Sequence, residues 1–379
     1  MHILIAPNAF KHSLNATEVA DAIAEGLRAS RFAGTWSTCP VGDGGDGTAA
    51  LLLRHLGGLE VTAAARDPLG RVLESRFVLI DEGRTAIIEL AEASGLRHLR
   101  SDELDPLRAT SFGTGELMRA ALDRGVGEII LCVGGSATVD GGTGILRALG
   151  ARFLDAEGAV LTTLPGSMME LAAIDMTRID PRLGACRLTI LCDVTNPLVG
   201  ARGAAAVFGP QKGAAPAAVI ALDAALGRFS DIVFAQTGRQ IGNLERGGAA
   251  GGVAAGLFGL LDATLENGID YFLERVGFDA AIAKADVVIT GEGSIDEQTV
   301  EGKGPWGVAV RARRQGAFVV GLAGQVPLSA SPALRSGFDA LIAIGNRAMS
   351  VTEAMQCTAE NLRRTALDLG NLFALRELP

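Results

Sequence analysis

Lysine is rare in this chain, and the few lysines fall where a charged side chain could do chemistry. Of 34 basic residues only four are lysine, and three of these lie in candidate loops, Lys11 after an apolar run and Lys212 and Lys303 beside glycines. A compact ammonium binds phosphate or carboxylate as a point charge, a role that the forked guanidinium of arginine does not reproduce. Lys284 stands in a helical context, and we expect it to be a surface charge. The loop lysines predict an anion-binding site, unless four lysines are too few to interpret.

A second glycine-rich loop carries two carboxylates. Residues 42–47 read Gly-Asp-Gly-Gly-Asp-Gly, which formally matches the GxGxxG pattern of dinucleotide-binding loops. Such a loop presents bare backbone amides to a pyrophosphate, whereas Asp43 and Asp46 would place negative charge against it. Two carboxylates together with water and substrate phosphate suit Mg²⁺. The sequence therefore favours a metal site at Asp43 and Asp46; the alternative is an Asp-Gly turn that caps a helix beginning at Thr48.

A third loop could hold an anion through its backbone. Residues 134–142 follow an apolar run at 129–133, precede a helical pattern at 145–149, and include the hydroxyls of Ser136 and Thr138. Backbone N–H groups in such a loop, and a helix N-terminus behind it, favour phosphate. The pattern is not a Walker A loop, because GxxxxGK[ST] occurs nowhere in the chain. Loops of this kind also arise where a strand and a helix pack tightly.

Three further carboxylates, Asp193, Glu292 and Asp296, also occupy loops that follow apolar runs. Ligands of open α/β sheets bind outside the carboxyl ends of the strands, so these groups could accept a proton from a substrate hydroxyl or hold a metal. Each could equally be a turn or cap residue. The chain has four histidines and no GxSxG motif, which argues against histidine-based hydrolase triads and zinc sites. Phosphoryl transfer needs cations, amides and carboxylates, and this inventory fits it.

Composition narrows the class of protein further. The 379 residues are 48% hydrophobic and 20% charged with a formal net charge of −9, which excludes a disordered chain. No basic run is present, so we expect neither a nucleic-acid partner nor an anionic membrane surface. Five well-separated cysteines without a CxxC, no signal peptide and no apolar run of about 20 residues indicate a cytoplasmic protein. A homodimer is compatible with the sequence.

The elements that would position these loops alternate along the chain. Amphipathic helical patterns at 17–29 and 115–124 lie between short apolar runs, and Asn15 with Glu18 would form a capping box for the first helix. Continuous apolar runs are typical of parallel strands that are covered on both faces, so the alternation predicts an α/β fold. Residues 72–90 read instead as a hairpin around the turn at 81–84. The apolar runs are 3–5, 129–131, 188–191, 287–289, 319–321 and 341–344.

At its loops the chain resembles the bacterial glycerate kinase type I family, the two-domain glycerate 2-kinases. The matching segments keep one order across nearly the whole chain: 7–14, 43–48, 111–116, 134–138, 192–198, 207–214, 289–293 and 295–296. The first motif departs from the common Asp-Ser-Phe-Lys-Gly-Ser by having Asn8, Ala9 and His12, and Val139 stands where Asn is usual. The residues at Lys11 and Ser13 match.

The resemblance implies a fold and a reaction. The fold would be a discontinuous Rossmann/flavodoxin-like parallel-sheet domain, residues 1–65 and 286–379, with a second α/β domain, residues 66–285, inserted in it. The reaction would be ATP-dependent phosphorylation of D-glycerate to 2-phosphoglycerate with Mg²⁺, in the cleft between the domains. We expect the strands at 3–5, 287–289, 319–321 and 341–344 to share one sheet.

Roles follow as hypotheses from this reaction. Lys11 would hold the glycerate carboxylate, with Ser13 and Asp296 as further substrate-binding groups. Lys212 would neutralise charge on the transferring phosphoryl group, and Asp193 would orient the attacking hydroxyl and accept its proton, with Asp296 as the next candidate. Mg²⁺ would be held by Asp43, Asp46 or Glu292. The ATP phosphates would lie against Gly134, Gly135, Ser136, Ala137 and Thr138.

Several other readings of the sequence remain open at this point. One is a kinase that makes 3-phosphoglycerate or acts on another hydroxy acid. Another is a nicotinamide dehydrogenase built on residues 42–47, for which Asp67 supplies the required acidic residue only loosely. A third is a non-catalytic sensor of nucleotides or sugar acids, which would leave the carboxylates in the strand-end loops unexplained.

Overall fold

The computed structural model describes residues 1–375 and separates into two compact units. The first unit is Met1–Asp43 together with the chain from Ile269 onward, and the second is Gly44–Gly268. The predicted fold class, a discontinuous parallel-sheet domain with an inserted α/β domain, is confirmed. The expected boundaries at 65/66 and 285/286 need correction to 43/44 and 268/269. The reason is that strand β3 (Leu59–Arg66) pairs along its whole length with a strand of the second unit.

The first unit is built on a five-stranded sheet in the order β13-β12-β11-β1-β2, in which every neighbouring pair is parallel. The strands predicted at 3–5, 287–289, 319–321 and 341–344 do share this sheet. Strand β2 has the sequence Thr-Trp-Ser-Thr and is largely exposed, so it gives no apolar run from which it could be predicted. The five strands are β1 (His2–Ile5), β2 (Thr35–Thr38), β11 (Val287–Ser294), β12 (Phe318–Gln325) and β13 (Ala340–Ala343).

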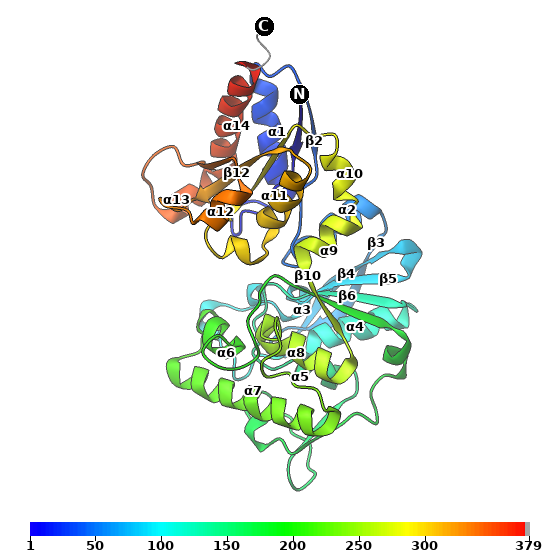
Figure 1. Cartoon of the computed structure of the whole chain (residues 1–379). Coiled ribbons are helices and arrows are strands. Elements are labelled where there is room, and N and C mark those ends of the chain that lie inside the picture. The colour runs from blue at the N-terminus through cyan, green and yellow to red at the C-terminus, as the bar shows by residue number, and fades with distance from the viewer. Residues whose placement is uncertain (376–379) are drawn as a thin grey trace. The chain divides into compact units, whose positions relative to one another are not determined.

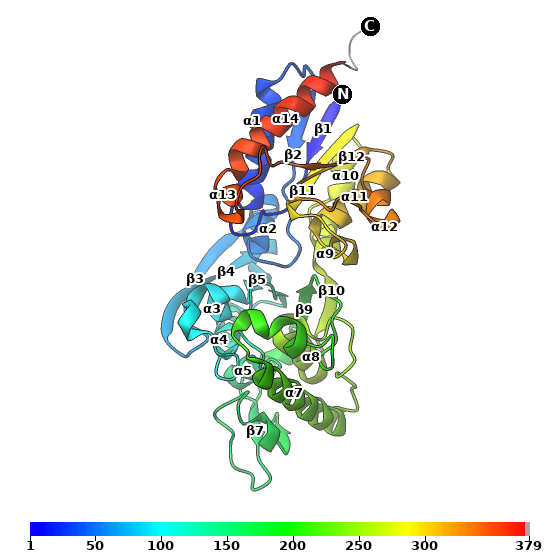
Figure 2. The same cartoon turned by 90° about the vertical axis from the view of Figure 1, so that its left-hand side faces the viewer.

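Helices cover both faces of this sheet. Figure 2 shows α1 and α14 side by side on one face, with α10 and α11 on the other. Helix α1 begins with the predicted capping box, because Asn15 accepts from the backbone N–H of Glu18 and Glu18 accepts from that of Asn15. The helices are α1 (Ala16–Ala29), α9 (Gly268–Arg275), α10 (Phe278–Ile282), α11 (Gly304–Arg314), α12 (Pro332–Gly337), α13 (Val351–Gln356) and α14 (Thr358–Ala374).

The order in which the chain adds strands to this sheet reverses between β1 and β11, although all the strands are parallel. From β1 it passes to β2 at one edge, whereas β11, β12 and β13 follow each other toward the opposite edge. Loops that leave the carboxyl ends of two strands at such a switch point diverge, and the crevice between them is the general ligand site of doubly wound sheets. By this rule the loops that follow β1 and β11 are the place in the first unit to look for a ligand site.

The second unit contains a six-stranded mixed sheet in the order β10-β9-β6-β5-β4-β3. Strands β10, β9, β6 and β5 are parallel, and β4 is antiparallel to both β5 and β3. The hairpin expected within residues 72–90 is the β4–β5 pair. The strands are β3, β4 (Val72–Ile80), β5 (Thr85–Glu89), β6 (Glu128–Cys132), β9 (Arg187–Cys192) and β10 (Thr264–Asn267), and a separate pair is formed by β7 (Arg152–Leu154) and β8 (Ala173–Asp175).

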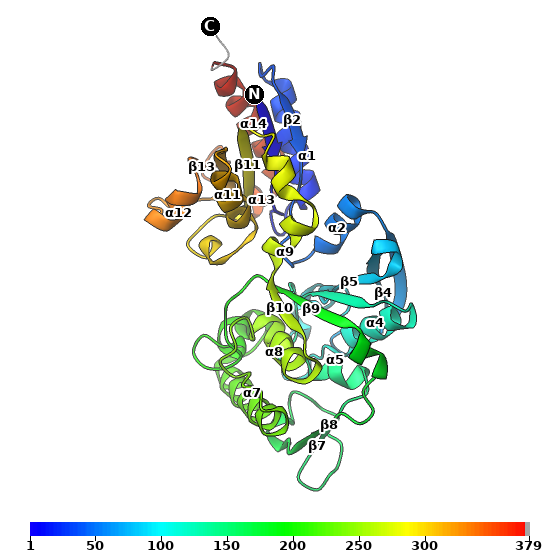
Figure 3. The ribbon, with the colours of Figure 1, turned by 45° about the vertical axis from the view of Figure 1, so that its right-hand side comes forward.

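One large hydrophobic core fills the space between this sheet and its helices. It joins Phe77 of β4 and Ile129 of β6 to Leu117 of α4, Ile145 of α5 and Phe229 of α7. Figure 3 shows α4, α5 and α8 on one side of the sheet, while α2 lies against β4 and β5 on the other. The helices are α2 (Thr48–Leu56), α3 (Ala91–Ser94), α4 (Phe112–Asp123), α5 (Thr143–Ala148), α6 (Ala204–Phe208), α7 (Pro216–Thr237) and α8 (Ala249–Leu261). Figure 1 traces the same elements along the chain.

Among residues 1–375, no helix combines the length and the apolar character that a membrane span requires.

Candidate functional site

In the first unit, Asn8 and Asp43 meet beyond the carboxyl end of β1. The Asn8 amide Nδ2 donates to Asp43 Oδ2 at 2.7 Å, and the backbone N–H of Ala9 donates to Asn8 Oδ1 at 2.8 Å. Asn8 and Asp43 are both buried. Gly304 at the start of α11 lies so close that a Cβ placed on it would come within 2.6 Å of Asn8 Nδ2. Asn8, itself packed against Gly304, thus fixes the position of the Asp43 carboxylate.

Glu292, near the end of β11, belongs to the same cluster. It is buried, and the Thr299 hydroxyl donates to its Oε1 at 3.0 Å. Burial raises the pKa of Glu292 to about 7, and the negative charge of Asp43 adds to this shift, while Lys303 and Lys11 oppose it. The structure therefore brings two of the predicted metal ligands, Asp43 and Glu292, and two of the loop lysines into one electrostatic neighbourhood of the first unit.

The remaining predicted residues of the first unit are more accessible. Lys11 is exposed, and the half-buried Ser13 donates its hydroxyl to the backbone carbonyl of Met355 at 2.6 Å. His12 has a left-handed backbone with φ of 64°, at the position where the motif usually has glycine. Asp296 accepts from the backbone N–H of Gln298 at 2.9 Å, which is a local turn contact.

In the second unit, Lys212 is buried against the glycine-rich loop that follows β6. Its Nζ donates to Ser136 Oγ and to the backbone carbonyl of Thr138, both at 2.7 Å. Burial lowers the pKa of Lys212 to about 7, and the charge of Asp140 opposes this shift. The hydroxyl Oγ1 of Thr138 is also buried and has no hydrogen-bond partner. The lysine and the loop predicted to act together are therefore in direct contact.

The loop itself offers fewer amides than the sequence suggests. The backbone N–H of Gly134 donates to the carbonyl of Gly44 at 3.2 Å, and that of Ala137 donates to the carbonyl of Ser94 at 2.9 Å. Ala137 and Thr138 are almost completely buried, whereas Gly135 is exposed and has a φ of 69°. Gly135 is therefore the part of this loop that a ligand of the second unit could reach directly.

Asp140 was not among the predicted site residues, yet it organises the end of this loop. It is completely buried, and its Oδ2 accepts from the backbone N–H and the hydroxyl of Ser111, both at 2.8 Å. The backbone N–H groups of Gly142 and Gly144 donate to the same carboxylate at 3.1 and 3.2 Å. The sequence shows an Asp within a glycine-rich loop, but only the fold places Ser111 beside it.

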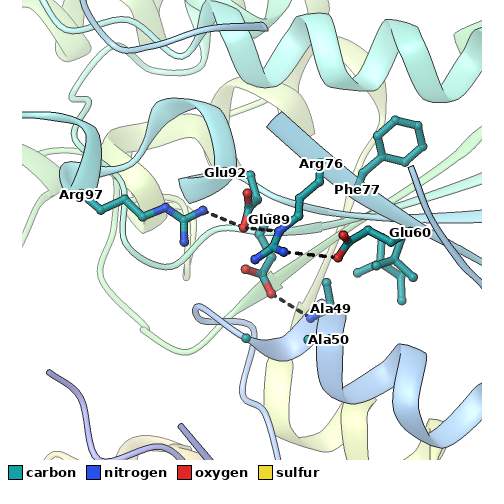
Figure 4. A pocket seen from close by; sticks show the side chains of 11 residues that line it. Ala49, Ala50, Glu60, Arg76, Phe77, Glu89, Glu92 and Arg97 are labelled. Carbon is teal, nitrogen blue, oxygen red and sulfur yellow. Dashed lines mark hydrogen bonds and ion pairs between the residues drawn. The ribbon is translucent and has the colours of Figure 1, made fainter. Parts of the chain in front are cut away.

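Glu89 is a second buried carboxylate that the predictions missed. It ends β5, and its Oε1 accepts from the backbone N–H of Ala49 at 2.8 Å, near the start of α2 (Figure 4). Helix α2 has no side-chain cap of its own at Gly47, so Glu89 supplies the acceptor. Burial raises the pKa of Glu89 to about 7; hydrogen bonds from Ala49 and Gly47 oppose the shift, and the charge of Asp46 adds to it.

Figure 4 also shows that Glu89 borders a pocket with ion pairs at its rim. Arg76 contacts Glu60 at 3.4 Å and Glu92 at 3.3 Å, and Arg97 contacts Glu92 at 2.7 Å. Because the guanidinium groups are paired with these carboxylates, the rim presents no surplus of positive charge toward an anion. Glu89 therefore acts in this pocket as the anchor of α2.

The other two predicted carboxylates of the second unit lie at different places around the loops. Asp193 directly follows β9, which is parallel to β6, so it shares the sheet edge from which residues 134–138 emerge. It is half-buried. Asp46 is exposed, and its Oδ1 lies 2.6 Å from the point where Gly135 would carry a Cβ. An alanine at position 135 would thus press on Asp46.

Within the described residues, no three carboxylate, histidine or cysteine side chains are grouped so as to hold a metal ion. The predicted set of Asp43, Asp46 and Glu292 is therefore not a ready-made three-ligand cluster. Mg²⁺ commonly uses one or two carboxylates and completes its shell with water and substrate phosphate. Asp43 and Glu292 fit that requirement.

Known proteins resemble this chain over nearly its whole length. The model of the Glycerate kinase family matches residues 3–374. The chain belongs to the glycerate kinase family. It is 42% identical over 369 residues to a glycerate kinase of Bacillus subtilis, with 97% of each chain covered, and 38% identical over 375 residues to a glycerate 2-kinase of Escherichia coli, covering 99% of this chain and 98% of that one.

A solved structure supports the same conclusion. The crystal structure of a proposed glycerate kinase 2 from Salmonella typhimurium LT2 has a TM-score of 0.83 and 42% sequence identity, and all of each chain is covered. As a member of this family the protein is a kinase, and ATP-dependent phosphorylation is the general reaction of the family. The family resemblance noted from the sequence motifs is thereby confirmed, and the dehydrogenase and sensor hypotheses are set aside.

Proposed function

We propose that this kinase transfers the γ-phosphoryl group of ATP to the 2-hydroxyl of D-glycerate and releases 2-phosphoglycerate and ADP. The observation that supports the 2-position is the similarity over nearly the full chain to a relative named glycerate 2-kinase. The chemistry of the two units supports the reaction class, because each unit gathers a lysine and carboxylates at loops that leave the carboxyl ends of parallel strands.

In this proposal the first unit binds the acid. Lys11 provides the positive charge for the glycerate carboxylate, and Ser13 and Asp296 provide further polar contacts. The Ser13 hydroxyl donates its proton in a hydrogen bond to the Met355 carbonyl. Toward the substrate it would therefore act as a hydrogen-bond acceptor. A small anion with two hydroxyls needs such a fixed set of contacts, because only one of its hydroxyls must be brought into line with the phosphoryl group.

The second unit contributes the nucleotide side of the reaction. We assign the ATP phosphates to the loop of Gly134, Gly135, Ser136, Ala137 and Thr138, with Gly135 as its accessible amide. Lys212 is buried beneath this loop and donates to Ser136 and to the Thr138 carbonyl. Its positive charge would therefore stabilise the phosphates from behind the loop and not by direct contact. Asp193 would orient the attacking hydroxyl and accept its proton, which a loose transition state releases late.

Mg²⁺ fits the carboxylates that the chain offers. Asp43 and Glu292 would hold it in the first unit, and Asp46 is the candidate carried by the second unit. When bound, Mg²⁺ would neutralise the charge that develops on the phosphate oxygens. A cation beside Glu292 would also favour its ionised form, against the effect of burial.

The test is a coupled ADP-release assay with D-glycerate, with and without Mg²⁺, followed by phosphorus NMR of the product. We expect release of ADP that requires both D-glycerate and Mg²⁺, and a resonance of 2-phosphoglycerate. A resonance of 3-phosphoglycerate would overturn the regiochemistry while keeping the reaction. ADP release that is stimulated by another hydroxy acid and not by D-glycerate would overturn the substrate.

A further inference from the structure

The two loops at the switch point of the first unit each carry one lysine. Lys11 lies in the loop after β1, and Lys303 lies in the longer loop after β11, immediately before α11. Since β1 and β11 are neighbours in the sheet, these loops leave adjacent strand ends. The chain has only four lysines in 379 residues, so their presence in both loops of one crevice is the feature to be explained.

The charges of both lysines act on the same buried carboxylate. Lys303 and Lys11 each interact electrostatically with Glu292, which is 8% exposed and accepts a hydrogen bond from Thr299. Neither lysine is itself buried, because Lys11 is exposed and Lys303 is half-buried. Both lysines therefore bring positive charge to the crevice beside Glu292.

The backbone at Lys303 is fixed relative to the rest of the cluster. Lys303 has an extended conformation, with φ of −74° and ψ of 166°, and α11 starts at the next residue. That residue, Gly304, packs against the Asn8 side chain, which in turn donates to Asp43. Lys303 is therefore positioned by contacts to the loop after β1 and by its link to α11, as a binding residue requires.

We propose that Lys303 is a substrate-binding residue that forms, with Lys11, a two-lysine clamp for an oxyanion at the switch point. This deepens the proposed function and rests on it, since that proposal assigns a single cation to the acid. Two groups of the reactants have the required chemistry, the carboxylate of the hydroxy acid and a phosphate of ATP. With a second cation, the crevice can bind a negatively charged ligand although the carboxylates Asp43 and Glu292 lie nearby.

The test uses Lys303→Met, which keeps the length of the side chain and removes its charge, with Lys284→Met as the matched control. Lys284 is an exposed lysine of the same unit, just beyond α10, so its loss should leave kinetics unchanged. We expect Lys303→Met to raise KM roughly 10- to 100-fold for one substrate, as loss of a hydrogen bond to a charged group does. A rise for D-glycerate identifies the carboxylate, and a rise for ATP identifies the phosphate.

Unchanged KM values for both substrates in Lys303→Met would overturn the clamp. Failure of the proposed function is distinguishable, because equilibrium binding of D-glycerate and of ATP to wild type and Lys303→Met is measured separately by calorimetry. If wild type does not phosphorylate D-glycerate but Lys303→Met still weakens binding of either ligand, the clamp stands and the proposed reaction falls. Equal binding to wild type and variant overturns the clamp whatever the activity. Circular dichroism of the variant confirms that it is folded.

Discussion

Lys212 Nζ lies 2.7 Å from Ser136 Oγ inside the second unit, where neither side chain is more than 7% exposed. A lysine is rarely buried to this degree without a strong reason, because removing an ammonium from water is costly. Here Ser136 Oγ and the Thr138 carbonyl accept hydrogen bonds from its ammonium group, and Asp140 is the nearby negative charge. These contacts link Lys212 to the loop after β6. Lys212 was expected to face the transferring phosphoryl group, but in the structure its contacts are to that loop, which it stabilises.

Lys212→Met should therefore destabilise the protein as well as lower its activity. The substitution removes two hydrogen bonds and leaves the buried Asp140 carboxylate without its positive neighbour. Leaving a buried hydrogen-bonding group without its partner costs about 1–3 kcal/mol, and we expect a loss of at least this order in the free energy of unfolding. Urea denaturation measures it. Lys284→Met, on the surface of the first unit, should stay within about 0.5 kcal/mol of wild type. A similar value for Lys212→Met would contradict the structural role.

The raised pKa of Glu89 makes the free energy of unfolding depend on pH. Its pKa is raised from 4.5 to about 7, mainly by burial, so between these values the folded state binds the proton more tightly than the unfolded state. The contribution of Glu89 to stability is thus full below pH 4.5 and is lost as the pH rises through 7. Glu89→Gln cannot titrate. Between pH 5 and 8 its free energy of unfolding should therefore rise relative to wild type, by up to roughly 3 kcal/mol.

Denaturation of wild type and Glu89→Gln at several pH values measures this difference. Glu60→Gln is the matched control, because Glu60 lines the same pocket and is itself exposed. For Glu60→Gln we expect a difference from wild type that is nearly constant across the range. A flat difference for Glu89→Gln as well would show that burial does not control the ionisation of Glu89.

Much of the fold could be predicted because buried parallel strands are apolar throughout. The runs at 129–131 and 188–191 became β6 and β9, and the hairpin after Val72 became β4 and β5. Strand β3 was missed because it alternates between exposed and buried residues and contains three consecutive alanines, which favour no strand on their own. This omission also moved the expected domain boundary, since the pairing of β3 with β4 decides to which unit the segment belongs.

The sequence predicted which positions contribute to the candidate site, but not how deeply each side chain is buried. Asp43 and Glu292 were expected from the strand-end rule, and the same rule, applied to the Glu that ends the buried strand Thr85–Glu89, would have found Glu89 as well. The burial of Lys212 carries no local signal, because both Lys212 and the exposed Lys11 stand in loops whose sequences do not say what packs over them. Burial depends on which distant segments pack over a side chain.

Asp193→Asn tests the assignment of the proton acceptor. An amide keeps the size of the side chain but cannot accept the proton, so we expect kcat to fall about 10²- to 10⁴-fold with little change in either KM. Steady-state kinetics with D-glycerate and ATP measure this effect. Asp231→Asn, at an exposed position of α7, should be neutral. Normal turnover of Asp193→Asn would remove Asp193 from the chemistry, and Asp296→Asn would then be expected to show the loss.

Gly304→Ala tests the contact that holds the cluster of the first unit together. A Cβ at position 304 would come within 2.6 Å of Asn8 Nδ2, so the amide must move and its 2.7 Å hydrogen bond to Asp43 must lengthen or break. We expect a loss of about 1–3 kcal/mol in the free energy of unfolding, as for other overpacked sites, together with a higher KM for D-glycerate. Gly227→Ala is the matched control, because its Cβ would meet nothing within 4 Å in the middle of α7. There alanine should stabilise the helix by about 0.5–1 kcal/mol. If Gly304→Ala behaved like Gly227→Ala, the Asn8 side chain would have to be free to move, and the fixed position of Asp43 would be wrong.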